Sequence, residues 1–209
     1  MSGAAQLGIT LSEKAIDLFA IFYRELIRWN RTTSLTAITA EKDVVIKHFL
    51  DSLSPLGLNL SGPLIDVGTG AGFPGVPIKI VRPEMEVTLV ERSAKRVLFL
   101  KHLARALQLT DLKIVEGDAR VISKSLEFHQ RFNLVISRAT YSLSELAKLA
   151  SPLLAPGGKV VAMKGPRYIE ELSRFEAEPR SHLMVEQIVP MTLPFSGEKR
   201  VLVVMEARA

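Results

Sequence analysis

The stretch LIDVGTGAGFPG, at residues 64–75, contains the residues best suited to hold a ligand. An apolar run leads into it and an apolar helical pattern follows, so we expect the loop to join a strand to a helix. Gly68, Gly70 and Gly72 can adopt positive φ and let a ligand approach the backbone where a Cβ would clash. Open α/β sheets bind ligands at the carboxyl ends of their strands, so this loop predicts a site for a nucleotide-like cofactor.

Two cofactors fit these glycines. The spacing Gly70-x-Gly72-x-x-Gly75 satisfies the dinucleotide fingerprint and would indicate an NAD(P)-dependent oxidoreductase. Taken instead from Asp66, the string DVGTGAG resembles the first motif of S-adenosylmethionine-dependent methyltransferases. The acid inside the strand and the two prolines that crowd the helix start favour the second cofactor, which has no pyrophosphate to cradle. A plain tight turn is the third interpretation, and the entropic cost of so many glycines disfavours it.

Two acids follow the glycine loop at places where a nucleoside would lie. Glu91 ends the second predicted strand, nineteen residues after Gly72, and can accept hydrogen bonds from both ribose hydroxyls. Asp118, just after the third predicted strand, can accept from an adenine amino group or can cap the next helix. Both interpretations hold for NAD and for S-adenosylmethionine, so they support a nucleoside without choosing between the cofactors.

Basic side chains cluster after the second predicted strand. Residues 92–105 contain five basic side chains and no acid. Arg92, Lys95 and Arg96 fall in or beside the first turn of a helix, where cations oppose the helix dipole, so an anionic partner such as RNA would explain them. Arg200 is a further candidate for the same RNA-facing rim. A solvated basic helix face is the alternative.

Short apolar runs alternate with helical patterns from residue 64 onward. The predicted strands are 64–67, 87–91, 112–116, 133–137, 159–163, 183–190 and 200–206. Helical patterns occupy about 75–82, 93–108, 119–126, 142–154 and 168–177. Strand–helix alternation predicts a parallel sheet, and the helix-free turn at 194–198 predicts that the last two strands form an antiparallel hairpin.

The predicted fold class is therefore α/β. Five parallel strands followed by a hairpin give the Rossmann-like, seven-stranded, mostly parallel sheet of class I S-adenosylmethionine-dependent methyltransferases, with an antiparallel last strand. Residues 1–60 are predicted to form an N-terminal helical extension, and residues 61–209 one compact methyltransferase domain. The extension should hold two helices. The first begins with a capping box made by Thr10 and Glu13, and the second, over 40–53, carries His48 and Asp51 on one face.

The 209 residues carry a formal net charge of +5 and no cysteine. Without cysteine, a disulfide scaffold, a thiolate metal site and a cysteine nucleophile are excluded. Residues 1–60 hold six basic and six acidic side chains, so the positive excess lies in the rest of the chain and permits a polyanionic partner. The four histidines are scattered and predict no metal site. Neither a signal peptide nor a membrane span is visible, so we expect a cytoplasmic protein without a membrane partner.

Several strings, in order along the chain, carry a resemblance to one family. They are LTAI, KHFLDSL, LIDVGTGAGFPG, VERSAKRVLFLKHL, FNLVISRA and LLAPGGKVVAMKGP. From about Trp29 to Val204 the chain resembles the bacterial 16S ribosomal RNA guanine-N7 methyltransferases, also called glucose-inhibited division protein B. The combination of GxGFPG, VISRA and KGP is far more specific than a glycine loop.

The resemblance implies methyl transfer from S-adenosylmethionine to N7 of one guanine in 16S rRNA. The substrate would be the rRNA, an assembly intermediate or the small ribosomal subunit, and we expect the enzyme to be a monomer. Carried over by position, the cofactor contacts fall on Gly68, Phe73, Ala119, Arg120 and Arg138. Arg120 replaces the family's usual acid, so only a backbone contact is expected there. Ser34 replaces the family's usual asparagine before LTAI.

The acceptor that this resemblance implies needs little catalysis. Guanine N7 has an in-plane lone pair and no proton, so its methylation needs alignment and no general base. The chain lacks the cysteines of carbon-5 methylation and the Asn/Asp-Pro-Pro-Tyr/Phe string of exocyclic-amine methylation. In the place of that string, Arg138 could hold the cofactor's carboxylate or the guanine edge. Lys164, after the fifth strand, could meet an rRNA phosphate or guanine O6, and these two residues are our catalytic candidates.

Two other classes of function stay open. An NAD(P)-dependent oxidoreductase would need an acid or base for hydride transfer, and no Tyr-x-x-x-Lys pattern is present. A non-catalytic RNA-binding protein could keep a cofactor pocket for stability alone. Cofactor binding separates the first class from a methyltransferase, and a methyl-transfer assay separates the second.

Overall fold

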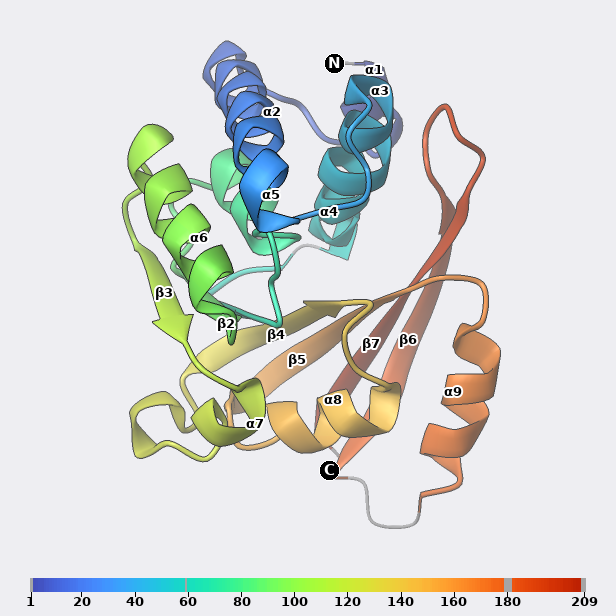
Figure 1. The fold of residues 1–209 in the computed structure, drawn as a ribbon. Coiled ribbons are helices and arrows are strands. Elements are labelled where there is room, and N and C mark those ends of the chain that lie inside the picture. The colour runs from blue at the N-terminus through green and yellow to red at the C-terminus, as the bar shows by residue number, and fades with distance from the viewer. Residues whose placement is uncertain (1, 59, 179–181, 208–209) are drawn as a thin grey trace.

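The sheet has seven strands in the order β3-β2-β1-β4-β5-β7-β6. The computed structural model describes residues 2–58, 60–178 and 182–207. The first five strands run parallel, and β7 is antiparallel to both β5 and β6, which confirms the predicted parallel sheet and hairpin (Figure 1). The strands are β1 (Leu64–Val67), β2 (Val87–Glu91), β3 (Leu112–Glu116), β4 (Phe132–Arg138), β5 (Leu154–Lys164), β6 (Leu183–Thr192) and β7 (Lys199–Ala207).

Helices cover both faces of the sheet and make three layers. The N-terminal helices lie with α5 and α6 on one face, and α7, α8 and α9 lie on the other (Figure 1). The helices are α1 (Ser2–Gln6), α2 (Glu13–Thr33), α3 (Glu41–Val44), α4 (Asp51–Leu53), α5 (Gly75–Val81), α6 (Ala94–Ala106), α7 (Ala119–Ile122), α8 (Leu143–Ala150) and α9 (Tyr168–Glu176). A π-helix, Val45–Leu50, connects α3 to α4, and short 3-10 helices cover Ser54–Leu58 and Leu126–Phe128.

Side chains of the central strands alternate between two hydrophobic cores. Leu64 of β1 and Leu134 of β4 face the core beneath α2, α5 and α6, whereas Ile65 and Val135 face the core beneath α8. All four side chains are at most 1% exposed. Burial on both faces explains why these parallel strands appear in the sequence as continuous apolar runs.

Two predicted helices end earlier than expected. The helix predicted over 119–126 ends at Ile122, and Ser125 then accepts a hydrogen bond from the Glu127 N–H to begin a separate 3-10 turn. The helix predicted over 142–154 ends at Ala150. Pro152 cannot continue a helix, because it lacks the N–H and disfavours helical backbone in the residue before it. The chain can therefore begin β5 at Leu154.

The start of α2 and the second N-terminal helix also differ from the prediction. Ser12 is the N-cap of α2, and its Oγ accepts from the Ala15 N–H at 3.1 Å. The predicted capping box of Thr10 with Glu13 is therefore wrong. A capping box needs its acid at the third helical residue, and Glu13 is the first. The helix predicted over 40–53 is interrupted by its π-helical segment.

The N-terminal helices share a core with the sheet and do not stand apart from it. Phe22 of α2 is fully buried, with its ring centroid 5.1 Å from that of Phe73 in the glycine loop and 5.2 Å from that of Phe49. Trp29 packs on Phe99 of α6 at 5.7 Å between ring centroids. The boundary predicted at residue 60 therefore separates two sequence patterns that share one hydrophobic core.

This shared core predicts one cooperative unfolding transition. Phe22→Ala removes a fully buried ring and should lower the free energy of unfolding by about 3–5 kcal/mol, in a transition that includes the N-terminal helices and the sheet. Chemical denaturation followed by circular dichroism and by the fluorescence of the single tryptophan measures this. Phe195→Ala truncates the same side chain at a 58% exposed position and should change the stability by about 0.5 kcal/mol or less. Two separate transitions would contradict the shared core.

Candidate functional site

The glycine loop is held in place by a buried acid of β1. Asp66 Oδ2 accepts hydrogen bonds from Thr69 Oγ1 at 2.6 Å and from the Gly75 N–H at 2.8 Å, so it ties the loop to the start of α5. Burial raises the pKa of Asp66 from 3.8 to about 6, and these two hydrogen bonds oppose the rise. Gly68 has a φ of 74°, and a Cβ there would meet Thr140 Cγ2 at 2.8 Å. Only glycine lets the loop pass this close to the end of β4.

A first cavity of about 270 Å³ lies beside this loop, over the carboxyl ends of β1 to β4. Its lining brings together the predicted cofactor residues Gly68, Glu91, Asp118, Ala119 and Arg120. It also includes Arg92 and Arg96 from the basic cluster, whereas Lys95 is exposed outside the lining. The sequence therefore found most of one wall, and the RNA contacts of the basic residues stay a prediction.

Glu91 fixes two backbone segments at the edge of the first cavity. It is 4% exposed, and its Oε2 accepts from the Gly70 N–H at 3.0 Å while Oε1 accepts from the Ser93 N–H at 2.8 Å. Arg96 Nη1 lies 3.9 Å from Oε2. Each carboxylate oxygen has a second lone pair, so Glu91 can also accept from ribose hydroxyls at this edge.

Asp118 caps α7 while it lines the first cavity. Its Oδ1 accepts from the Arg120 N–H at 2.8 Å, so the interpretation as a helix cap is confirmed. Arg120 Nη2 donates to Glu145 at 3.3 Å, and its guanidinium lies 5.9 Å from the Tyr141 ring centroid. The Arg120 side chain is thus occupied by neighbouring residues, which fits the expectation of a backbone contact only.

Phe73 and Gly72 lie outside the lining of the first cavity. Phe73 is 4% exposed, and its ring centroid is 4.5 Å from that of His48 and 5.0 Å from the guanidinium carbon of Arg138. The side chain therefore packs in the N-terminal core, and a contact of residue 73 with the cofactor stays a prediction. Gly72 serves packing, since a Cβ there would meet Val76 Cγ2 at 2.8 Å.

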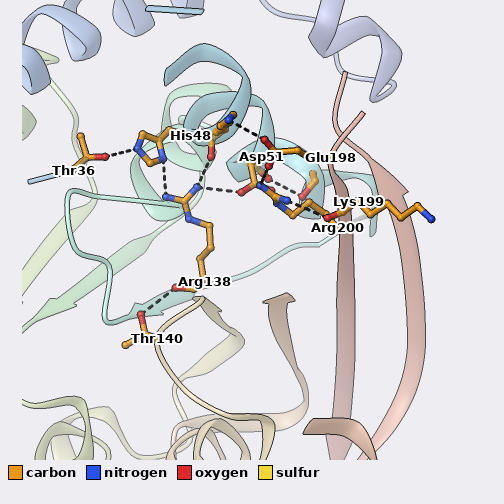
Figure 2. A network of polar contacts seen from close by, with 10 residues as sticks. Thr36, His48, Asp51, Arg138, Thr140, Glu198, Lys199 and Arg200 are labelled. Atoms are coloured by element: carbon orange, nitrogen blue, oxygen red, sulfur yellow. Dashed lines mark hydrogen bonds and ion pairs between the residues drawn. The ribbon is translucent and has the colours of Figure 1, made fainter. Parts of the chain in front are cut away.

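Arg138 connects the end of β4 to the N-terminal helices (Figure 2). Its Nη1 donates to the Lys47 carbonyl at 3.0 Å and to Asp51 Oδ2 at 3.3 Å, and its Nη2 donates to His48 Nδ1 at 3.2 Å. The side chain is only 16% exposed. Arg138 is therefore not a solvated surface residue, and its guanidinium is held on three sides.

The π-helix Val45–Leu50 leaves the Lys47 carbonyl available to accept a hydrogen bond from Arg138. In an α-helix, the Asp51 N–H would donate to the Lys47 carbonyl. Here it donates to the carbonyls of Ile46 and His48, and the Lys47 carbonyl accepts from Arg138. Single π-helical turns occur frequently at functional sites, where they change the direction of side chains.

His48 is a neutral acceptor in this network. Because Arg138 donates to Nδ1, the ring proton must be on Nε2, which donates to Thr36 Oγ1 at 2.8 Å. Burial, followed by the positive charge of Arg138, lowers the pKa of His48 from 6.5 to about 4. His48 therefore stays uncharged at neutral pH and orients the guanidinium.

A chain of alternating charges continues from Arg138 across the ends of β5 and β7. Asp51 Oδ1 lies 3.3 Å from Arg200 Nε, and Arg200 Nη2 lies 2.8 Å from Glu198 Oε2. Glu198 Oε1 in turn lies 2.9 Å from Lys47 Nζ. The Arg200 side chain is 22% exposed and pairs with a buried acid, so it lies at the second cavity and not beside Arg92 and Arg96, and its contact with RNA stays a prediction. Burial raises the pKa of Asp51, and the two arginines oppose this rise.

Lys164 at the end of β5 is buried, and two of its three N–H donors are used within the protein. Its Nζ donates to the Tyr141 carbonyl at 2.5 Å and to Glu171 Oε2 at 2.6 Å, and the residue is 8% exposed. Lys164 is therefore not a solvated residue at the end of its strand. It ties the segment after β4 to α9.

A second cavity of about 510 Å³ lies on the other side of this segment, over the ends of β4, β5 and β7. The structure brings Arg138, Lys164 and Arg200 together here. Arg138 is thereby separated from the other predicted cofactor residues, which line the first cavity. Residues 138–141 separate the cavities, since Arg138 and Ala139 line the second and Thr140 and Tyr141 line the first. The sequence analysis missed Thr140, Tyr141, Lys47 and Glu198. Position alone could have indicated the first two, because they follow a strand end.

The sheet order, the glycine loop and the cavity over the strand ends define a class I methyltransferase fold. Solved structures agree: TrmN from Thermus thermophilus matches with a TM-score of 0.60 and 19% identity, over 76% of this chain and 48% of that one. Fibrillarin from Aeropyrum pernix, solved with bound S-adenosyl-L-methionine, matches with a TM-score of 0.53 and 15% identity, over 69% of this chain and 66% of its own.

The particular family follows from sequence similarity. The family model of rRNA small subunit methyltransferase G matches residues 15–202. The ribosomal RNA small subunit methyltransferase G of Caldanaerobacter subterraneus subsp. tengcongensis is 41% identical over 99% of this chain and 87% of its own length. That of Geobacter metallireducens is 37% identical over 97% of this chain and 92% of its own. The chain belongs to this family.

The described part of the chain shows neither a cluster of metal ligands nor a membrane-spanning helix. Residues 2–58, 60–178 and 182–207 contain no cluster of three or more histidine, aspartate or glutamate side chains that could hold a metal ion. Over the same ranges, we find no helix that has both the length and the apolarity to span a bilayer.

The neutral, buried His48 predicts a pH dependence of stability. In the folded protein its pKa is about 4, below the 6.5 of an unperturbed histidine, so the unfolded chain binds the proton more tightly. The stability that neutral His48 contributes is complete above about pH 6.5 and is lost as the pH falls towards 4. The difference in unfolding free energy between the wild type and His48→Gln should shrink by roughly 2–3 kcal/mol over this range.

Denaturant unfolding of both proteins between pH 4 and 7 measures this difference. Asp66 changes its charge in the same range with the opposite sign, since burial raises its pKa. Both proteins contain Asp66, so its contribution cancels in the comparison. A difference that stays constant with pH would mean that His48 is not buried as a neutral ring.

Proposed function

We propose that this protein transfers a methyl group from S-adenosylmethionine to N7 of a guanine in the rRNA of the small ribosomal subunit. The observation that carries the proposal is the pair of cavities on either side of residues 138–141, both over the carboxyl ends of the parallel strands. Membership of the rRNA small subunit methyltransferase G family supports the rRNA substrate. We also infer a monomer that acts in the cytoplasm.

The first cavity fits S-adenosylmethionine. This cofactor supplies a methyl group on a positively charged sulfur, which needs no metal ion and no base from the protein. Gly68 lets the cofactor approach the backbone, and Glu91 offers its remaining lone pairs to the ribose hydroxyls. Asp118 Oδ2 and the backbone of residues 119–120 are available for the adenine.

The second cavity fits a nucleobase that needs positioning alone. His48 is neutral, and both of its ring nitrogens are engaged by Arg138 and Thr36, so it is not available as a general base. Asp51 is likewise held between two arginines. An acceptor without a proton, such as guanine N7, suits this arrangement because catalysis then depends on proximity and orientation. The nucleotide would reach the cavity by leaving the base stack.

We refine the roles of the two catalytic candidates accordingly. Three of the five N–H donors of Arg138 are used within the protein, which leaves others for the guanine or the cofactor's carboxylate. Lys164 can meet the guanine O6 or a phosphate through its remaining N–H. The basic residues Arg92, Lys95 and Arg96 would contact rRNA phosphates beside the first cavity.

The proposed reaction predicts labelled methyl transfer to small-subunit rRNA or to assembled subunits. N7 methylation leaves a cationic base, so the product should be cleaved at one guanine after reduction and aniline treatment. Rate measurements with rRNA and with subunits identify the preferred substrate. Label without scission would assign the methyl group to another atom, and no label on either substrate would refute the proposed function.

The cofactor assignment predicts selective binding that depends on Glu91. Calorimetry should show binding of S-adenosylmethionine and none of NAD. Glu91→Gln removes the charge at the ribose edge and should weaken the affinity by about tenfold or more, because hydrogen bonds to charged acceptors are the stronger ones. Glu170→Gln changes an exposed glutamate of α9 away from the first cavity and serves as the matched control. Equal affinity in the wild type and Glu91→Gln would place the ribose elsewhere.

A further inference from the structure

The polar side chains around the second cavity are mostly hydrogen-bond donors. Lys47, Arg138, Lys164 and Arg200 line it, and their charged groups can only donate. Such groups can hold guanine O6 or a phosphate, which are acceptors. They cannot recognise the N1–H and 2-amino groups of guanine, which donate. Donors at O6 already disfavour adenine, whose 6-amino group donates, but recognition of the N1–H and 2-amino groups needs an acceptor as well.

Three side chains of the cavity lining could accept a hydrogen bond: those of His48, Asp51 and Glu198. Both ring nitrogens of His48 are occupied. Asp51 is 4% exposed, and each of its oxygens faces an arginine. Neither group can turn to a ligand without leaving a buried cation unpaired, which is strongly unfavourable.

Glu198 differs from the other two because its partners are replaceable. Its side chain is 36% exposed. It makes ion pairs with Lys47 and Arg200 at the turn between β6 and β7. These ion pairs are partly buried, and Glu198 is the most exposed of the three acceptors, so its two partners are the ones that a bound base can most readily replace. Arg200 would keep its contact with Asp51 after the exchange.

The order of residues across the cavity matches the order of groups around guanine. Arg138 lies beside the segment that borders the first cavity, Asp51 lies next, and Glu198 lies beyond it near Arg200 (Figure 2). Guanine N7 must face the first cavity to receive the methyl group. Its O6 then lies towards the cations, and its N1–H and 2-amino groups lie on the far side, where Glu198 is.

We propose that Glu198 is the residue that selects guanine, by accepting hydrogen bonds from N1–H and the 2-amino group of the flipped base. This inference rests on the proposed function. Adenine presents an acceptor at N1 and no 2-amino group, so the Glu198 carboxylate would face a lone pair and remain unpaired. Lys47, released from Glu198, would keep its ion pair with Asp43 at 3.5 Å and could turn a further N–H to the phosphate of the same nucleotide.

The test combines a change in the protein with a change in the RNA. Inosine lacks the 2-amino group but keeps N7, so small-subunit rRNA with inosine at the methylated position is a substrate without one donor. For the wild type, inosine should lower kcat/KM for methyl transfer by about tenfold or more. Glu198→Gln should lower kcat/KM with guanine by a similar factor, and inosine should then cause little further loss.

Glu186→Gln is the matched protein control, since Glu186 lies on the same hairpin and pairs with Lys159 away from both cavities. It should retain the wild-type penalty for inosine. Inosine at a neighbouring guanine controls for changes in RNA structure. Glu198→Gln keeps one neutral acceptor oxygen and puts an NH2 donor in the place of the other, whereas Glu198→Asp keeps the whole carboxylate. Glu198→Asp should therefore retain part of the penalty, which covers the case in which Glu198→Gln folds poorly.

Two results would overturn the inference. One is a wild type that methylates the inosine-containing rRNA as well as the guanine-containing rRNA. The other is an inosine penalty of equal size in the wild type and Glu198→Gln, which would show that Glu198 only holds Lys47 and Arg200. An inactive wild type on unmodified rRNA would refute the proposed function instead, so the two failures are distinguishable.

Discussion

The buried ion pair between Asp51 and Arg138 is the interaction on which the rest of this structure depends. It connects the N-terminal helices to the end of β4, and its two side chains are 6% and 16% exposed. Ion pairs this deep stabilise a protein only when further partners satisfy both groups, and removing one partner costs about 3–5 kcal/mol. The Lys47 carbonyl and His48 complete the shell around Arg138, and Arg200 completes that around Asp51.

The two cavities follow from where the parallel strands end. Parallel strands present all their carboxyl ends at one edge of the sheet, so the loops after β1 to β5 meet there. The segment after β4 lies in the middle of this edge and becomes the wall between the cavities. A reaction that needs only alignment requires none of the nearby acids as a base. Asp66, Asp51 and Glu91 can then all serve to hold backbone and side chains in place.

The fold was predictable from local patterns, and the errors have local causes. Six of the seven strands lie close to their predicted ranges, because buried parallel strands are continuous apolar runs, whereas β5 begins at Leu154, five residues before its predicted start. The cap of α2 was misplaced, since Thr10 and Ser12 are both good capping residues and the choice depends on where the chain turns. The π-helix in the second N-terminal helix was not predictable, because its register is set by the contact of Lys47 and Asp51 with Arg138.

By itself, the sequence determined the class of the fold, the glycine loop and the residues around the first cavity, because all of these follow from strand ends and glycine conformations that are local in the chain. Only the tertiary structure decided that Phe73 lies in the core, that Arg200 is paired and that Glu198 faces the second cavity. The burial of Phe73 depends on its packing against the N-terminal helices, and the other two outcomes depend on contacts between the start of β7 and a helix that precedes it by some 150 residues. No local pattern encodes such contacts, since they form only when the N-terminal helices and the hairpin pack at the same edge of the sheet.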